Sequence, residues 1–236
     1  LGLPALHPIG DAAARRPLYE DPTRIIGTRP YEPTDPLRRI HWKATAKAQE
    51  LRSKQHEATT TTRLAVFLNL DTLGRYAKYR GFVRALLEMN ILTAASIASW
   101  GIETGYLVGL YANGYLPQGL RWIRIPPSSG SAHLAGMLEA LAKVFPTPAM
   151  PIGDLMQLEA PSLPWGTTVV VVTAVTDPPL AAGVARLRES GHAAVAVLVG
   201  DRAEPGALPV PVYRVPAARG WEALEGLAVE RVGGAP

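Results

Sequence analysis

The sequence predicts an α/β domain in which a mainly parallel β-sheet carries helices on both faces, preceded by a small irregular N-terminal segment. Continuous apolar runs such as Leu64–Leu70 and Trp165–Val175 are typical of parallel strands buried on both faces. Helical patterns alternate with these runs through most of the chain. The chain has 236 residues, 47% of them hydrophobic, and is therefore long and apolar enough to bury a core of this kind.

The main domain is expected to comprise residues 63–236. Strands are expected at Leu64–Leu70, Gly105–Tyr111, Leu120–Ile125, Trp165–Val175 and Ala193–Val199, and a short edge strand at Val210–Val215. Helices are expected at Arg80–Trp100, Ser131–Val144, Pro179–Ser190 and Trp221–Val229. Asn113 and Gly114 are turn-forming residues that fit the connection between the second and third strands.

The smaller segment, residues 1–62, is expected to pack on the main domain. Residues 1–35 are rich in proline and turn-forming residues and are expected to be irregular. Asp35 and Pro36 favour a helix start, since Asp caps a first turn and Pro fits the first helical position. A short helix is therefore expected to run to about Lys47, followed by a strand at Leu51–Glu57.

Positive charge is concentrated in the first quarter of the chain. Residues 1–63 hold 11 Lys and Arg against 7 Asp and Glu, whereas residues 64–236 hold 13 of each. The stretch Arg38–Lys54 alone carries six cations against Glu50. Such a segment can bind an acidic partner, or it can form the solvated face of a small subdomain.

The common sequence motifs of enzymes are absent. The chain has no phosphate-binding glycine loop, no dinucleotide fingerprint, no nucleophile elbow, no HExxH and no cysteine. Ser128, Ser129 and Ser131 lie near His133, but this pattern is more typical of a helix start followed by an exposed histidine. The sequence therefore predicts neither a catalytic residue nor a cofactor.

Residues 27–57 contain a long signature: an Arg-x-Tyr pair, an Asp, an Arg and an Ile-His-Trp-Lys run. It comprises Arg29, Tyr31, Asp35, Arg38, Ile40, His41, Trp42 and Lys43, and Ala46 and Lys47 continue it. In order and spacing it resembles the signature of the bacterial family called domain of unknown function 58. Thr34 stands where that family usually has Gly.

The resemblance implies a von Willebrand A-like domain after the signature. It also implies a protein at the cytoplasmic side of a bacterial membrane, since members commonly follow two membrane-spanning helices. Members are often encoded beside a MoxR-type AAA+ ATPase, which is the expected protein partner. No apolar run in this chain is long enough to span a bilayer, so we expect any membrane anchor to lie upstream of Leu1.

The resemblance also implies where a metal site would lie. Von Willebrand A domains hold a metal with Asp-x-Ser-x-Ser after the first strand and an Asp from a later loop. Here Leu73 and Arg75 stand at the two serine positions after Asp71, and Ala174 stands at the later Asp position, three residues before Asp177. We expect no bound metal, with Asp71 either paired with Arg75 or capping the next helix.

The signature supports a structural and a functional interpretation, which the sequence leaves open. In the first, Ile40 and Trp42 anchor the segment and Arg29 or Arg38 pairs with Asp35; Trp42 is then mostly buried. In the second, the cations of the signature (Arg38, Arg39, Lys43 and Lys47) face an acidic partner, with His41 and Trp42 at the contact centre, since Trp, Tyr and Arg are common at interface hot spots. In both, at least two of Arg39, Lys43 and Lys47 are exposed.

The sequence as a whole predicts a non-catalytic protein–protein interaction module that does not bind nucleic acid. The candidate partner-binding residues are Arg29, Tyr31, Asp35, Arg38, Arg39, His41, Trp42, Lys43 and Lys47. Two alternatives are a metal-dependent adhesion-type binder and an enzyme whose site is not recognised.

Overall fold

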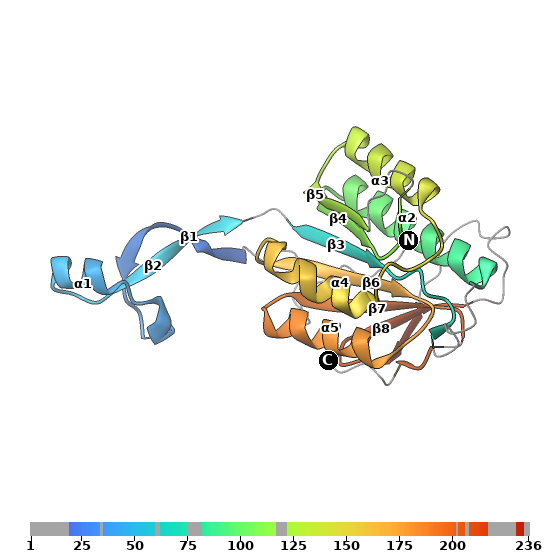
Figure 1. Cartoon of the computed structure of the whole chain (residues 1–236). Coiled ribbons are helices and arrows are strands. Elements are labelled where there is room, and N and C mark those ends of the chain that lie inside the picture. Colours follow the sequence, from blue (N-terminus) through green and yellow to red (C-terminus); the bar gives the residue numbers. More distant parts are fainter. Residues whose placement is uncertain are drawn as a thin grey trace. The chain divides into compact units, whose positions relative to one another are not determined.

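The computed structural model of the chain describes residues 19–33, 35–59, 62–74, 82–116, 122–201, 203–205, 208–216 and 230–233. These residues form two compact units: a small unit within Tyr19–Thr59 and a large unit that begins at Thr62. Figure 1 labels the helices and strands of both units. The helix expected at Trp221–Val229 and the side chain of Arg75 lie outside the described residues.

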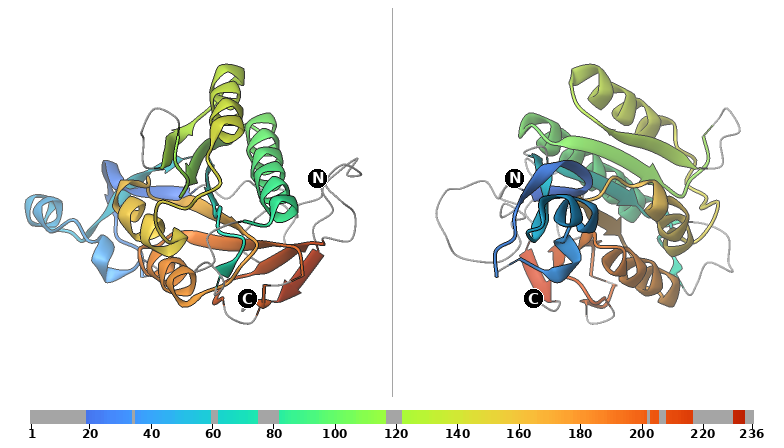
Figure 2. Two further views of the ribbon diagram at one scale, coloured as in Figure 1. Left: turned by 45° about the vertical axis from the view of Figure 1, so that its right-hand side comes forward. Right: turned by 90° about the vertical axis from the view of Figure 1, so that its left-hand side faces the viewer.

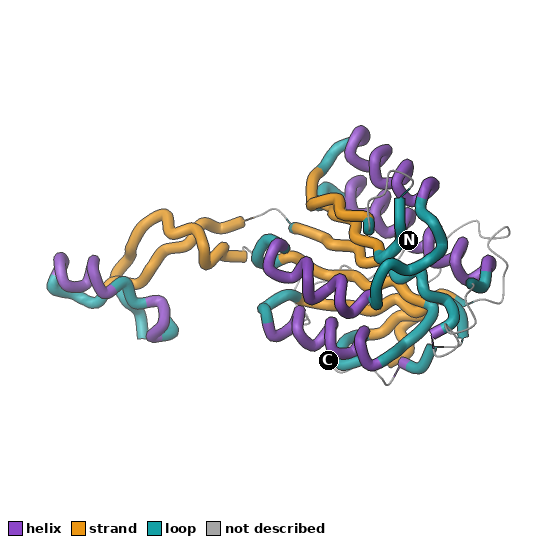
Figure 3. Tube along the Cα trace, viewed as in Figure 1, coloured by secondary structure: helices purple, strands orange, loops and turns teal. Residues whose placement is uncertain are grey.

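The small unit is a two-stranded antiparallel ribbon with a helical connection. Strand β1 (Tyr19–Pro30) pairs with β2 (Arg52–Thr59), and the register shifts on either side of Ile25. A 3-10 turn, η1 (Leu37–Arg39), and a short helix, α1 (Trp42–Ala48), lie between the strands, as Figure 3 shows. The expectation that residues 1–35 are irregular is therefore wrong for Tyr19–Pro30.

The helix of the small unit begins later than the sequence predicts. Asp35 does not cap it; the backbone stays extended at Pro36, makes one 3-10 turn, and is extended again at Ile40. Ile40 is buried and forms a β-bridge with Ser53, which interrupts the helix that Pro36 would otherwise start. The α-helix then begins at Trp42, with His41 as its N-cap.

The large unit contains a seven-stranded sheet in the order β5-β4-β3-β6-β7-β8-β9. The parallel strands are β3 (Arg63–Leu68), β4 (Leu107–Ala112), β6 (Thr167–Thr173), β7 (Ala193–Val199) and β8 (Val212–Val215). The antiparallel strands β5 (Ile123–Ser128) and β9 (Glu230–Gly233) lie at the two edges. The predicted mainly parallel sheet is confirmed, but β8 is not an edge strand, because β9 pairs with it.

Helices cover both faces of this sheet (Figure 2). Alternate residues of β3 point to opposite sides: Leu64 and Val66 share a core with α2 (Arg84–Glu103) and α3 (Ser131–Lys143). Ala65 and Phe67 share a second core with α4 (Ile152–Glu159) and α5 (Pro178–Glu189). The helices on both faces are therefore confirmed, while α4, and the 3-10 turn η3 (Ala160–Ser162) that follows it, were not predicted.

Helices α4 and α5 contact each other at the level of their backbones. A Cβ atom added to Gly153 would lie 1.8 Å from the carbonyl oxygen of Pro179, and one added to Gly183 would lie 2.7 Å from the Cα of Gly153. Only glycine fits both positions, so the second layer depends on these two residues.

Helix α2 is apolar because it packs against the sheet. By length and composition alone, an 18-residue window of this 20-residue helix, with a mean hydropathy of 1.3, could cross a bilayer, so the expectation that no apolar run is long enough is wrong on these two criteria. Half of that window is buried, however, and residues such as Leu87, Ala94 and Ile97 belong to the first core. The composition of α2 is that expected of a core helix covered by neighbouring elements.

Candidate functional site

The buried half of the signature is a polar clamp centred on Asp35, which is 8% exposed. Its Oδ1 accepts a hydrogen bond from Arg29 Nη2 at 2.5 Å; its Oδ2 accepts from the Glu32 backbone N–H at 3.1 Å and the Ser53 hydroxyl at 2.8 Å. The bonds from Glu32 and Ser53, then from Arg29, hold the pKa of Asp35 below its usual 3.8. Since Arg29 belongs to β1 and Ser53 to β2, the carboxylate joins both strands to the connection.

Tyr31 and His41 also serve the local structure. The Tyr31 hydroxyl donates to the backbone oxygen of Asp35 at 3.2 Å, and the Tyr31 N–H donates to the Leu51 carbonyl at 2.9 Å. The His41 Nδ1 accepts from the Ala44 N–H at 3.1 Å and so caps α1. These three candidate residues, Asp35, Tyr31 and His41, thus fix the shape of the connection.

The other half of the signature faces solvent. Trp42 is 69% exposed, so the prediction that it is mostly buried is wrong. Helix α1 lies against β2, where Thr45 Oγ1 accepts from the Arg52 N–H at 3.0 Å. Helix α1 has seven residues and none of them is buried, so it offers no apolar core in which Trp42 could pack.

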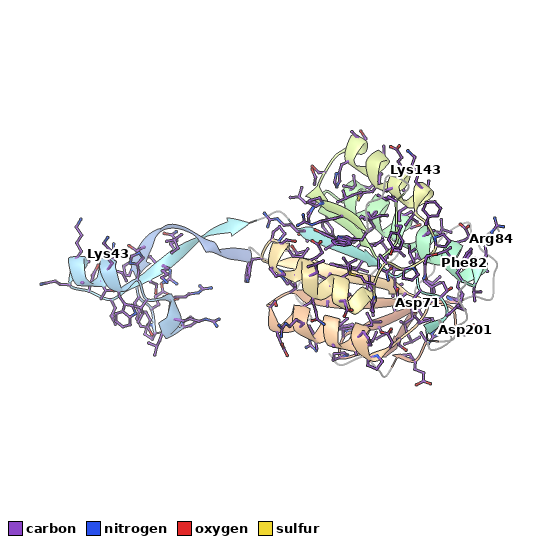
Figure 4. All side chains as sticks on the ribbon, viewed as in Figure 1. Lys43, Asp71, Phe82, Arg84, Lys143 and Asp201 are labelled. Atoms are coloured by element: carbon purple, nitrogen blue, oxygen red, sulfur yellow. The ribbon has the colours of Figure 1, made fainter. Side chains whose placement is uncertain are left out.

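The cations of the signature are mainly exposed, as predicted. Lys43 and Lys47 are exposed and Arg39 is half-buried, so two of the three meet the expectation. Arg38 is exposed as well. Within the described part of the chain, Arg38, Lys43 and Lys47 form no ion pair. Figure 4 marks Lys43 on α1.

Leu37 is an exposed residue beside these cations that the sequence analysis did not identify as a candidate. It is the first residue of η1 and is 71% exposed, more than any other large hydrophobic side chain described. The signal was present in the sequence, since an apolar residue between Pro36 and Arg38 has no helical or strand periodicity that would bury it. We refer to Leu37, Arg38, Trp42, Lys43 and Lys47 as the exposed face of the small unit.

The metal-site positions expected from the resemblance begin at the carboxyl end of the large unit's sheet, where Figure 4 marks Asp71. Asp71 Oδ1 accepts from the N–H groups of Leu73 at 2.8 Å and Gly74 at 3.0 Å, which occupies that oxygen with the loop's own backbone. Asp177 caps α5 by accepting from the Leu180 N–H at 2.8 Å. No group of three or more His, Cys, Asp or Glu that could hold a metal occurs among the described residues.

Amide side chains join the strand ends at this edge. Asn69 Nδ2 donates to Thr173 Oγ1 at 3.0 Å, and Asn113 Nδ2 donates to Asn69 Oδ1 at 3.1 Å. Asn90 of α2 donates to the backbone oxygen of Asn69 at 2.9 Å. All of these side chains are buried. Because amides and hydroxyls are neutral, this network connects β3, β4, β6 and α2 and offers a divalent cation little charge.

The Ser128–His133 region does not form a nucleophile pair in the structure. His133 Nε2 lies 2.7 Å from the Val108 carbonyl oxygen of β4, and the residue is half-buried rather than exposed. The N-cap of α3 is Gly130, which has no side chain, so the helix start has no side-chain cap. The histidine therefore joins α3 to the sheet.

An ion pair between exposed Arg124 and buried Glu159 lies on the face covered by α4. Arg124 Nε donates to Glu159 Oε2 at 2.7 Å, and Ser162 also donates to this carboxylate, at 3.0 Å. Burial, and then the negative charge of Glu159, raises the pKa of Tyr111 to about 12. Tyr111 stacks on Phe67 with ring centroids 4.8 Å apart, so this group is part of the core packing.

Residues 27–215 match the family model described as protein of unknown function DUF58. The match covers well over half of the chain and starts at the signature. The chain belongs to this family. Since the match extends to Val215, it takes in both units of the DUF58 chain, from the clamp to the end of β8.

Solved structures resemble the DUF58 chain at the level of fold. Proximal thread matrix protein 1 from the mussel byssus, with a zinc-occupied MIDAS motif, is 11% identical with a TM-score of 0.44, over 66% of this chain and 44% of that one. A von Willebrand factor type A protein from Catenulispora acidiphila is 14% identical with a TM-score of 0.41, over 68% and 39%. The DUF58 chain thus spans about two fifths of these proteins. No protein with a curated description matches its sequence.

Proposed function

We propose that this DUF58 chain is a non-catalytic protein–protein interaction module of a membrane-associated protein, acting with a MoxR-type AAA+ ATPase at the cytoplasmic side of the membrane. The observation that carries the proposal is the division of the signature into a buried clamp and an exposed face. Asp35, Arg29 and Ser53 hold the connection in shape, and Trp42 and the cations project from it.

An exposed Trp is a costly arrangement for a lone protein, and beside cations that form no ion pair among the described residues it is a useful one for binding. Trp42 is 69% exposed, whereas monomeric proteins usually place so large an apolar side chain at least partly in a core. Trp and Arg are the residue types most enriched among interface hot spots. The exposed face is therefore the best candidate for partner contact.

The non-catalytic assignment is supported by the roles of the polar groups in the described residues. Asp35, Asp71, His133, Asp177 and Glu159 all bond to the chain itself, as caps, turn-formers or ion pairs. The partner and the membrane association are proposed from the family resemblance, and the basic face supports an acidic partner.

The test is binding between the purified chain and a MoxR-type ATPase from the same organism, measured by calorimetry. The unmodified chain should bind, and Lys43→Glu/Lys47→Glu should weaken binding at least tenfold, because two attractive charges become repulsive. Arg84→Glu/Arg186→Glu is the matched control; it makes the same charge change on exposed cations of the large unit and should bind as the unmodified chain does. No binding by the unmodified chain would contradict the proposed partnership.

A further inference from the structure

The described side chains of the small unit form little apolar core. Among its described side chains Ile40 is the only buried hydrophobic one, at 4% exposure, whereas Leu37, Trp42 and Ile25 are 71%, 69% and 47% exposed. A two-stranded ribbon with so small a core is marginally stable alone, so the clamp around Asp35 must contribute much of its order. Polar contacts therefore stabilise this unit, while the large apolar side chains of Leu37, Trp42 and Ile25 are exposed to solvent.

We propose that Leu37 and Trp42 are anchors that insert into apolar pockets on a protein partner, and that the surface of the partner around these pockets is acidic. This inference rests on the proposed function and specifies its contact. In the sequence, Arg38 directly follows Leu37, and Lys43 directly follows Trp42. Lys47 lies one helical turn beyond Lys43. Because these three cations form no ion pair within the described residues, carboxylates of the partner are their natural complement.

Large side chains project from the exposed face of the small unit, so in the proposed complex the pockets belong to the partner. Apart from Trp42 and the lysines, the exposed residues of α1 are Ala46 and Ala48, which are too small to form the walls of a groove. An indole that projects from a shallow surface gains most when it fills a cavity from which water is excluded. A partner with a flat surface would leave the side chains of Trp42 and Leu37 partly exposed to solvent.

The fixed geometry of the face favours a protein over a lipid bilayer. The connection is held by the Arg29–Asp35 bond at 2.5 Å, the Ser53–Asp35 bond at 2.8 Å and the His41 cap on Ala44 at 3.1 Å. Pre-organisation of this kind raises affinity for a partner of defined shape, since less conformational freedom is lost on binding. A fluid bilayer has no fixed shape to match, and basic apolar segments bind it without such a clamp.

A photo-crosslinking amino acid placed at position 37 of the full-length protein, in its native host, tests the proposal without assuming the partner's identity. We expect one protein to be crosslinked, at a segment rich in Asp and Glu. Lys43→Glu/Lys47→Glu should reduce the yield more than tenfold, and replacing the crosslinked segment's carboxylates with lysines should restore it. The same probe at Leu138 on α3, which is also an exposed apolar position, is the control and should not capture that segment.

Each outcome decides something different. Crosslinks to lipid, no crosslink at all, or a protein crosslink that survives charge reversal would overturn the inference. If the charge-sensitive, acidic segment belongs to a protein other than the ATPase, the inference stands and the proposed ATPase partnership falls. If the ATPase is captured but the crosslinking yield is unchanged by the charge reversal, the partnership stands and the inference falls. Thermal unfolding of each variant, expected to match the unmodified chain, shows that the fold is intact.

Discussion

The Nη2 atom of Arg29 lies 2.5 Å from Oδ1 of Asp35, a carboxylate that is only 6% exposed. We predict that Asp35→Ala opens the connection between β1 and β2, because it leaves Arg29 and Ser53 without their shared acceptor. Limited proteolysis should cut the variant between residues 31 and 51 at least tenfold faster than the unmodified chain. Glu32→Ala is the matched control, since that carboxylate also faces Arg29, at 3.4 Å, but is 66% exposed. Equal protection of both variants would contradict the structural role of Asp35.

The large unit should lose stability in mild acid through His192. Burial lowers the pKa of this histidine from its usual 6.5, and a hydrogen bond to the Thr167 backbone offsets the shift only in part. Nδ1 has no hydrogen-bond partner among the residues that the structure describes, which also favours the neutral ring in the folded state. The associated stability is therefore full above about pH 6.5 and is lost as the pH falls from there through the lowered pKa. His192→Gln should flatten this part of the curve of melting temperature against pH; an unchanged curve would exclude His192 as its source.

The glycines between α4 and α5 should not tolerate even a methyl group. Gly153→Ala places a Cβ 1.8 Å from the Pro179 carbonyl oxygen, and separating the helices should cost about 1–3 kcal/mol or more of unfolding free energy. Gly136→Ala is the control: its Cβ would meet nothing within 4 Å in exposed α3, so it should stabilise by about 0.5–1 kcal/mol. Denaturant unfolding of both variants measures the difference, and a neutral Gly153→Ala would show that the layers separate easily.

The carboxyl edge of the sheet is predicted to bind no divalent cation. Asp71 uses Oδ1 for the Leu73 and Gly74 N–H groups, and magnesium needs near-octahedral oxygen coordination. Calorimetric titration with magnesium and manganese should give no binding heat for the unmodified chain. A Leu73→Ser/Arg75→Ser variant shows whether the serine oxygens alone would restore a site. Micromolar binding by the unmodified chain would instead support the adhesion-type alternative.

The central strands could be predicted because they are buried on both faces. Leu64–Leu70 and the valines of β6 form continuous apolar runs, and few other structures satisfy such runs. Strand β1 was missed because Pro22 and Gly27 interrupt it and its register shifts twice near Ile25, so no alternation is visible. Helix α4 was missed because eight residues after Pro151 are too short for a clear period.

The sequence predicted which residues belong to the candidate site, but not which of them are buried and which are exposed. The signature identifies Asp35 and Trp42 equally well, yet the structure buries the charged residue and exposes the apolar one. Sequence rules predict the opposite, because they assign burial by polarity alone. The difference arises from long-range partners, above all Ser53, which lies 18 residues from Asp35 and has no distinguishing pattern of its own.

The most direct test of a binding role for Trp42 is a paired measurement on Trp42→Ala: its unfolding free energy and its affinity for the MoxR-type ATPase. An exposed side chain should contribute less than about 0.5 kcal/mol to stability. An interface anchor should contribute about 2 kcal/mol or more to binding, which corresponds to roughly a 30-fold loss of affinity. Unchanged stability together with this loss is the predicted result. Destabilisation by several kcal/mol, or unchanged affinity in a stable variant, would contradict it.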